Sequence, residues 1–331
     1  MGIVDFQYIN KKVFSDEPDM APVREGFGDG LFELGETNPQ VVALCADLTD
    51  STKMGKFARA YPSRYIQIGI AEQNLASVGS GLATMGKIPF VSSYAMFNPG
   101  RNWEQIRTTI CYNDQPVVIV GSHAGVSVGP DGGTHQAIED IALMRVIPRM
   151  QVIVPSDSIE AQKATKACAD SGKPAYLRLA REKTAIVTTL ESPFEIGKAN
   201  VLWDDEHADV TIFACGPLVA SALKAADILN KEGIKVIVVN NHTVKPMDYD
   251  TVLSAVKETK AVVTVEEHQR AGGMGSAVAE YLAEHFPVPI EFIGVDDKFG
   301  QSGTPEELIE HYGMGISHIV DAVKRVIKRK G

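Results

Sequence analysis

The chain has 331 residues, more than one ordinary compact domain holds, and this length predicts two domains. Its composition, 44% hydrophobic and 22% charged, is that of a globular protein, and no segment approaches the ~20 apolar residues of a membrane span. A net charge of -10 argues against nucleic acid and anionic membranes as partners, so an anionic ligand would require a local cluster of cations.

Four widely spaced cysteines, at positions 45, 111, 168 and 215, form no zinc-binding or redox pattern. Such cysteines suit a reducing compartment. The first residues are polar and contain no apolar signal core. We therefore expect a soluble, cytoplasmic protein.

The predicted elements follow one another as strand, helix, strand. Residues 1–20 are polar without a clear period and are expected to form an N-terminal arm that lies on a neighbour or is partly mobile. Residues 23–34 have a helical pattern. Short apolar runs, expected to be strands, then alternate with helical patterns at residues 41–46, 65–68, 88–92, 116–121, 151–154 and 175–179.

A second series begins near residue 196, with strands expected at 210–215, 234–240, 261–266 and 290–295. Near-continuous apolar strands separated by helices predict an α/β fold of two doubly wound domains with largely parallel sheets. We place the boundary in the polar segment 184–194, between domains at 21–190 and 195–331. The final segment, 316–327, is expected to be an amphipathic helix docked on the protein rather than on a membrane.

Three patches could carry chemistry. The first, Gly-Ile-Ala-Glu-Gln-Asn at residues 69–74, places Glu72 where a strand gives way to a helix. A glutamate in the first turn of a helix is also favoured by the helix dipole alone, so both a catalytic and a purely structural role remain open.

The second and third patches also follow strands. Tyr94 and Phe97 would reach the same edge of the sheet, where they either flank a flat heterocycle or fill the core. The glycine-rich loop 121–136 contains His123, Asp131 and His135. A loop of this length is either part of an active site or a flexible surface connection.

Together the three patches resemble the pyrimidine-binding and C-terminal domains of transketolases over roughly residues 20–330, in the family's split, two-subunit form. The most specific matches are Gly-Ile-Ala-Glu-Gln-Asn at 69–74 and Asp-Gly-Gly-Thr-His-Gln at 131–136. The resemblance implies an enzyme that uses thiamine diphosphate to transfer a two-carbon ketol unit from a ketose phosphate to an aldose phosphate.

The resemblance also implies roles for individual residues. Glu72 would hydrogen-bond the aminopyrimidine ring of the cofactor, with Tyr94 and Phe97 around that ring and Asp47 near its thiazolium. His123 and His135 would join Glu72 as catalytic residues. The implied sugar-binding residues are Arg24, Ser51, His123 and Arg181 for the phosphate, and Asp131 and His135 for the hydroxyls. Read without the resemblance, Arg24 and Arg181 would be ordinary surface ion-pair residues.

Two departures from the family pattern stand out. A third aromatic residue is missing beyond Phe97, where residues 98–102 precede Trp103, a possible substitute. The half that binds the diphosphate and its divalent metal, Mg or Ca, is also missing. The resemblance therefore implies an N-terminal transketolase subunit as partner, self-association into a heterotetramer, and no metal site on this chain.

Two glycine motifs are similar to ligand-binding motifs but are not interpreted as ligand sites. Gly-Asp-Gly at residues 28–30 is similar to the family's metal motif, but it lies in a helical pattern, and after Asn38 the next asparagine is Asn74 in the catalytic patch. The glycines at 272–275 lack the full dinucleotide fingerprint. The C-terminal domain is expected to be structural and dimer-forming.

Four functions remain open on this architecture. Thr-His-Gln at residues 134–136 and the four-residue phosphate set favour a transketolase over a 1-deoxyxylulose-5-phosphate synthase. A 2-oxoacid dehydrogenase E1 β subunit would have no use for Arg24 and Arg181. A non-catalytic regulatory subunit of the same fold is the fourth, and the retention of Glu72, His123 and His135 argues against it.

Overall fold

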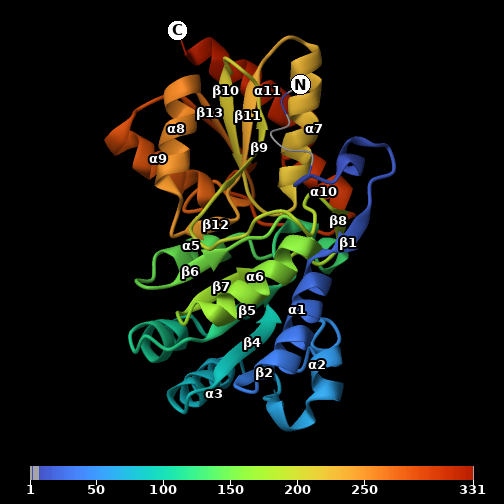
Figure 1. The fold of residues 1–331 in the computed structure, drawn as a ribbon, viewed down its shortest axis with the longest axis vertical. Coiled ribbons are helices and arrows are strands. Elements are labelled where there is room, and N and C mark those ends of the chain that lie inside the picture. Colours follow the sequence, from blue (N-terminus) through green and yellow to red (C-terminus); the bar gives the residue numbers. More distant parts are fainter. Residues whose placement is uncertain (1, 3–6, 331) are drawn as a thin grey trace.

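The chain forms two α/β domains, and each has a mainly parallel sheet with helices on both faces (Figure 1). The structure is a computed structural model that describes residue 2 and residues 7–330. The first domain lies below the second in Figure 1, and the predicted α/β fold is confirmed.

The first sheet has the strand order β12-β6-β7-β5-β4-β2-β3. Its strands are β2 (Val41–Cys45), β3 (Tyr65–Gln67), β4 (Ile88–Tyr94), β5 (Val118–Ser122), β6 (Gln151–Ile153), β7 (Ala175–Arg178) and β12 (Thr243–Lys245). All neighbours are parallel except β12, which is antiparallel to β6. In β2, Val42 and Leu44 join one core cluster while Val41 and Ala43 join another, so both faces of the sheet are covered.

Two groups of helices cover this sheet. One face carries α1 and α6, which lie side by side, with the shorter α2, and the other carries α3, α4, η3 and α5. The bounds are α1 (Val23–Thr37), α2 (Gly55–Ala60), η2 (Pro62–Arg64), α3 (Glu72–Thr84), α4 (Trp103–Gln105), the π-helix η3 (Ile106–Cys111), α5 (Asp140–Arg145) and α6 (Ser158–Asp170). The predicted helix over residues 23–34 is thus the greater part of α1.

The second sheet has the order β14-β13-β10-β11-β9, with β9 antiparallel to β11. Its strands are β9 (Asn200–Asp204), β10 (Val210–Ala214), β11 (Val236–Asn240), β13 (Val262–Gln269) and β14 (Ile290–Val295). The helices of this domain are α7 (Leu218–Lys231), α8 (Tyr249–Thr259), α9 (Met274–His285), α10 (Pro305–His311) and α11 (Ile316–Arg329). The four strands expected from the second series are confirmed as β10, β11, β13 and β14.

The two domains share a seam. The edge strand β12 comes from the second half of the chain but pairs with β6 of the first sheet. One apolar cluster also runs from Val42 and Leu75 in the first domain to Phe213 and Val239 in the second. The polar segment 184–194 therefore does not separate two independent cores.

The N-terminal arm packs on its own chain. Ile9 pairs with Thr188, and β1 (Met20–Pro22) pairs with β8 (Lys183–Ala185). Between them, Val13 of η1 (Lys11–Phe14) is buried against the second domain. The described part of the arm thus lies over the interdomain linker, where Ile9 and Val13 are buried.

The final helix docks as predicted. The apolar side chains Ile319, Val320 and Val323 of α11 are buried in the second domain, while Arg325 and Arg329 pair with Glu291 of β14. Across residue 2 and residues 7–330, none of the helices combines the length and apolar character needed to cross a membrane.

Candidate active site

The predicted site residues gather at one edge of the first sheet. In a parallel sheet the carboxyl ends of the strands meet at the same edge, where ligands usually bind. Asp47 follows β2, Glu72 follows β3, Tyr94 ends β4 and His123 follows β5. Arg181 follows β7 and therefore reaches the same edge.

Glu72 is the first residue of α3, and its side chain is only 3% exposed. Its two carboxylate oxygens have different partners. The Ser93 hydroxyl donates to Oε1 at 3.3 Å, and the Arg101 guanidinium lies 3.2 Å from Oε2. The backbone carbonyl of Glu72 accepts a 2.9 Å hydrogen bond from the Asn102 side chain. These contacts fix a buried carboxylate at the start of a helix.

A pocket of ≈ 490 Å³ opens over this carboxylate. It is lined by Ile70, Ala71, Glu72, Gln73, Asn74 and Arg101. The Arg101 guanidinium carbon lies 4.1 Å from the centre of the Phe97 ring, within cation–π range. Arg101 thus contacts both the Glu72 carboxylate and the Phe97 ring.

Four rings form a continuous cluster beside this pocket. Tyr94 stacks on His123 with ring centroids 3.9 Å apart, and lies 6.2 Å from Phe97. Phe97 contacts the edge of His135 at 5.4 Å, and the Nδ1 atom of His135 is 2.9 Å from the Thr134 hydroxyl. The structure therefore brings the aromatic patch and both loop histidines together.

His123 is buried, and its two ring nitrogens have defined roles. Its Nε2 atom lies 3.5 Å from Nη1 of Arg24, which can only donate, so Nε2 must accept. The proton then resides on Nδ1, which donates to Oγ of Ser122 at 2.8 Å. Burial, followed by the nearby cations of Arg24 and Arg181, lowers the pKa of His123 to about 3. His123 is therefore neutral at physiological pH.

Two arginines from distant parts of the chain meet beside His123. Arg24 donates from Nε to the Arg181 carbonyl at 2.9 Å and from Nη1 to the Ser51 carbonyl at 2.5 Å. Arg181 donates to the Val128 carbonyl and lies 3.7 Å from the Asp131 carboxylate. Burial and the charge of Arg181 lower the pKa of Arg24 below its usual value. The two guanidinium groups gather positive charge at this point of an acidic protein, and the Glu182 carboxylate lies 3.3 Å from Arg181.

Two predicted positions stand apart from these contacts. Asp47 is exposed, and its amide donates to the Gln67 side chain rather than contacting the ring cluster. Trp103 packs against the core, and its indole donates to the Leu143 carbonyl at 2.7 Å. Arg101, rather than an aromatic residue, covers the face of Phe97.

The second domain supports the loop over residues 121–136, which we did not anticipate from the sequence. This loop is largely buried and contains the short helix η4 (Val126–Asp131). The Gln136 amide donates to the carbonyls of Val126 and Gln301, at 3.0 and 2.9 Å. Ser127 donates to the buried Glu267 through both its amide and its hydroxyl. The interpretation of this loop as a flexible surface connection was wrong.

Arg101 belongs to the segment 98–102 between Phe97 and Trp103, to which the sequence analysis assigned no role. It lies four positions after Phe97, and its amide donates to the Phe97 carbonyl at 2.9 Å. An arginine one helical turn from an aromatic residue is a signal that could have identified it.

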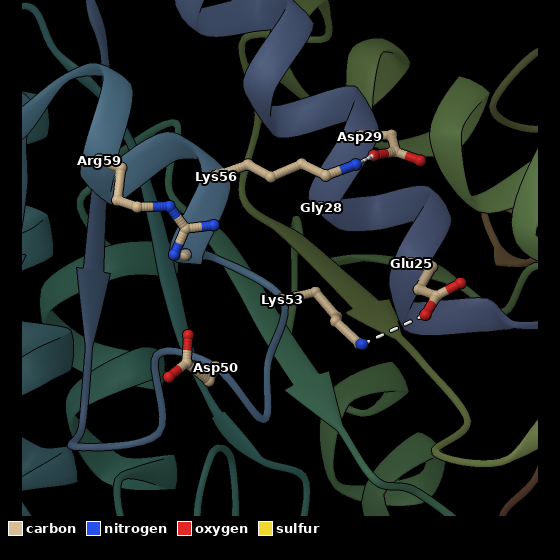
Figure 2. Close-up of a pocket in the computed structure, with 8 residues that line it drawn as sticks. Glu25, Gly28, Asp29, Asp50, Lys53, Lys56 and Arg59 are labelled. Carbon is tan, nitrogen blue, oxygen red and sulfur yellow. Dashed lines mark hydrogen bonds and ion pairs between the residues drawn. The ribbon is translucent and has the colours of Figure 1, made fainter.

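The Gly-Asp-Gly sequence at 28–30 lies inside α1, where its aspartate is paired with a lysine. Asp29 pairs with Lys56, and Glu25 pairs with Lys53 at 3.2 Å, as Figure 2 shows. The surrounding pocket of ≈ 330 Å³ is also lined by Asp50 and Arg59, so its carboxylates and cations balance. Among the residues that the structure describes, no group of three or more His, Cys, Asp or Glu could hold a metal ion.

The glycines at 272–275 also leave no room for a phosphate. The Glu266 carboxylate accepts the amides of Met274 and Gly275, at 2.7 and 2.8 Å, at the start of α9. Burial raises the pKa of Glu266 to about 7. A protein carboxyl group thus occupies the place where a dinucleotide fingerprint would bind its ligand.

The fold and the site together define a protein of the transketolase fold. The family model of the transketolase pyrimidine-binding domain matches residues 19–186, and that of the transketolase C-terminal domain matches residues 197–319. The chain therefore belongs to the transketolase family.

Some relatives match over nearly their whole length. The chain is 42% identical to a putative transketolase C-terminal section of Methanocaldococcus jannaschii, covering 93% of this chain and 97% of that protein. It is 40% identical to a 6-deoxy-6-sulfo-D-fructose transketolase subunit of a Clostridium species, covering 93% and 95%. A solved structure described as a split gene transketolase, inactive beta4 tetramer, has 46% identity and a TM-score of 0.87, covering 94% of this chain and 99% of that one.

Transketolases use thiamine diphosphate, and one end of this cofactor fits the site. A buried carboxylate next to an aromatic face, in a ≈ 490 Å³ pocket, suits a flat nitrogen heterocycle. The residues present therefore fit the pyrimidine end of the cofactor.

Proposed function

We propose that this chain is the C-terminal subunit of a two-subunit transketolase, which transfers a two-carbon ketol unit from a ketose phosphate to an aldose phosphate. The observation that carries the proposal is the shared edge of the first sheet. There, the buried Glu72 and the Phe97 ring are joined through Tyr94 and His123 to the cations of Arg24 and Arg181. A cofactor end and a phosphorylated sugar could thus occupy adjacent positions.

In this proposal Glu72 would hydrogen-bond a nitrogen of the pyrimidine ring. A carboxyl group in a dry pocket can share a proton with such a nitrogen, because water does not compete for it. Phe97 and Tyr94 flank the ring, and Asp47 lies on the thiazolium side. When bound, thiamine diphosphate supplies the reactive carbon that carries the two-carbon unit.

The sugar would lie along the loop 121–136. Arg24 and Arg181 provide two positive charges for the terminal phosphate, with His123 and Ser51 beside them. Because His123 is neutral, it serves as a hydrogen-bonding group rather than as a third cation. Asp131 and His135 are assigned to the sugar hydroxyls, and in this proposal His135, whose ring contacts Phe97, moves a proton there.

The anionic end of the sugar need not be a phosphate. Two guanidinium groups recognise any tetrahedral oxyanion through charge-assisted hydrogen bonds. One relative is described as acting on a sulfonated fructose. Comparing a 6-phosphate with a 6-sulfonate donor would identify the group that the Arg24–Arg181 cluster prefers.

The remaining half of the site would come from a partner. We propose an N-terminal transketolase subunit that binds the diphosphate and a divalent metal, Mg or Ca, with the two subunits forming a heterotetramer in the cytoplasm. Residues 21–190 would then be the pyrimidine-binding domain and 195–331 the C-terminal domain. The relative described as an inactive beta4 tetramer supports the need for a second subunit.

Reconstitution tests this proposal. The isolated chain is expected to bind thiamine diphosphate weakly and to show no ketol transfer, because the diphosphate and the metal provide much of the binding free energy. Adding the N-terminal subunit with Mg²⁺ should restore both. Calorimetry measures the binding, and a coupled assay measures the transfer. Tight binding by the isolated chain, or no transfer by the complex, would refute it.

A further inference from the structure

One arginine holds both groups that the cofactor needs. The Arg101 side chain pairs with the Glu72 carboxylate at 3.2 Å and lies 4.1 Å from the centre of the Phe97 ring. Under the proposed function, the pyrimidine ring needs that same carboxylate for its nitrogen and that same ring for its face. Where the pyrimidine takes Oε2 of Glu72 and the face of Phe97 that Arg101 covers, the two compete for the same contacts.

The backbone around Arg101 is well anchored, whereas its side chain is not. The Arg101 amide donates to the Phe97 carbonyl, and the next residue, Asn102, is buried and donates to the Glu72 carbonyl at 2.9 Å. The Arg101 side chain itself is 51% exposed. The guanidinium can therefore swing into solvent by side-chain rotation alone, while Glu72 stays in place.

Electrostatics explain why an arginine would lie here before the cofactor arrives. A buried carboxylate without a partner is costly, and the Ser93 hydroxyl at 3.3 Å compensates it only weakly. The Arg101 cation neutralises the charge, and its flat guanidinium stacks on Phe97 as a flat heterocycle would. The other side chains that line the pocket are uncharged.

We propose that Arg101 is a displaceable partner of the Glu72 carboxylate and the Phe97 ring, which the pyrimidine displaces when the cofactor binds. The proposal rests on the proposed function. It assigns Arg101 a positioning role. Arg101 contacts the Glu72 carboxylate and the Phe97 ring until the cofactor displaces it, and the loss of these contacts lowers the affinity for the cofactor. Cofactor binding and the departure of Arg101 from Glu72 are then one event.

The test uses the complex with the N-terminal subunit and follows binding rather than activity. Arg101→Ala should bind thiamine diphosphate with Mg²⁺ about three- to tenfold more tightly than the unmodified complex, because a competing internal partner has gone. It should also associate faster. Arg101→Lys, which keeps the charge but loses the flat stack, should fall between the two. Arg107→Ala, another exposed arginine nearby but outside the pair, is the matched control.

The outcomes are distinguishable. If the unmodified complex does not bind the cofactor, the proposed function fails. If it binds but Arg101→Ala binds equally or more weakly, only the displaceable-partner proposal fails. Thermal unfolding is measured for each variant. If Arg101→Ala is destabilised, Arg101→Lys takes its place in the comparison, and binding by Arg101→Lys no tighter than that of the unmodified complex overturns the proposal. In a crystal structure of the loaded complex, a guanidinium still lying on Phe97 and Glu72 would also overturn the proposal.

Discussion

At the scale of single residues, the position of Glu72 in the first turn of α3 has two explanations, a favourable helix dipole or catalysis. Its burial next to Phe97 and Arg101 goes beyond what a helix start requires, because a dipole-stabilised glutamate gains nothing from being dry. The catalytic explanation makes a specific prediction.

Glu72→Gln in the reconstituted complex should abolish turnover while changing cofactor affinity by no more than about tenfold, or about 1.4 kcal/mol. The amide keeps the shape but cannot manage the ring-nitrogen proton. Exchange of the cofactor's C2 proton, followed by NMR after acid quench, isolates this step, with Ser77→Ala, at an exposed position of the same helix, as control. Unchanged exchange in Glu72→Gln would reduce Glu72 to a helix-start residue.

Arg181 provides a second prediction at this scale. Arg181→Ala should raise KM for phosphorylated donors by the equivalent of about 1.5 to 3 kcal/mol, because one charge-assisted contact is lost. An unphosphorylated donor such as hydroxypyruvate should be nearly unaffected. We expect the same pattern for His123→Ala. Similar losses on both donors would show that Arg181 holds the loop through Val128, and that His123 supports the fold, rather than the sugar.

At the scale of elements, the start of α6 ties the two domains together. Asp157 caps the helix through the Glu160 amide and also accepts the amides of Val187 and Thr188 in the linker. Glu160 is buried, and its carboxylate accepts the Ser156 amide at 2.7 Å and the Asn240 side chain at 2.8 Å. Burial, followed by the charge of Asp157, raises the pKa of Glu160 to about 7.

This raised pKa predicts how stability depends on pH. Between about pH 4.5 and 7 the folded chain keeps the Glu160 proton that the unfolded chain has released, so this residue makes stability fall as pH rises through that window. Glu160→Gln should remove this part of the decline in stability, because an amide side chain does not titrate. The variant should still fold, because Asn240 has an unpartnered side-chain oxygen that can accept a hydrogen bond from the new amide.

The measurement is the melting temperature of the chain at pH 5.5 and pH 8. The difference between the two should be smaller for Glu160→Gln than for the unmodified chain. Glu284→Gln, on the exposed end of α9, should leave the difference unchanged. Equal differences for all three proteins would show that Glu160 titrates as an ordinary glutamate.

At the scale of the whole molecule, a buried ion pair lies at the seam between the domains. Arg178 of β7 donates to Asp140 at 2.7 Å, to the Ala137 carbonyl at 3.2 Å and to the Glu267 carbonyl at 2.9 Å. Burial alone would raise the pKa of Asp140, but Arg178 holds it below its usual value. This arginine thus links the end of the loop 121–136 to the second domain.

Arg178→Leu should destabilise the chain by about 3 to 5 kcal/mol, because it leaves a buried carboxylate unpaired. Arg325→Leu, which removes an exposed partner of Glu291, should cost less than about 1 kcal/mol. Denaturant unfolding measures both. A loss for Arg178→Leu no larger than that of the control would mean that water replaces the ion pair at the seam.

The sequence by itself determined the features that depend on neighbouring residues. Apolar runs predicted the parallel strands to within a few residues, because a strand buried on both faces must be apolar throughout. The helical period around residues 28–30 argued against a ligand site at Gly-Asp-Gly, and Asp29 is indeed bound to Lys56 inside α1. Motif spacing also placed Glu72, Tyr94, Phe97 and His123 at strand ends.

Only the tertiary structure decided what depends on residues far apart in the chain. The edge strands β9 and β12 are antiparallel, and β12 joins the sheet of the other domain, so local period could not assign them. The pairing of Arg24 with the Arg181 carbonyl spans 157 positions, and that of Arg101 with Glu72 spans 29. The neutral state of His123 and the pairing of Arg101 with Glu72 follow from such contacts, because burial and charge arise only once distant segments have packed together.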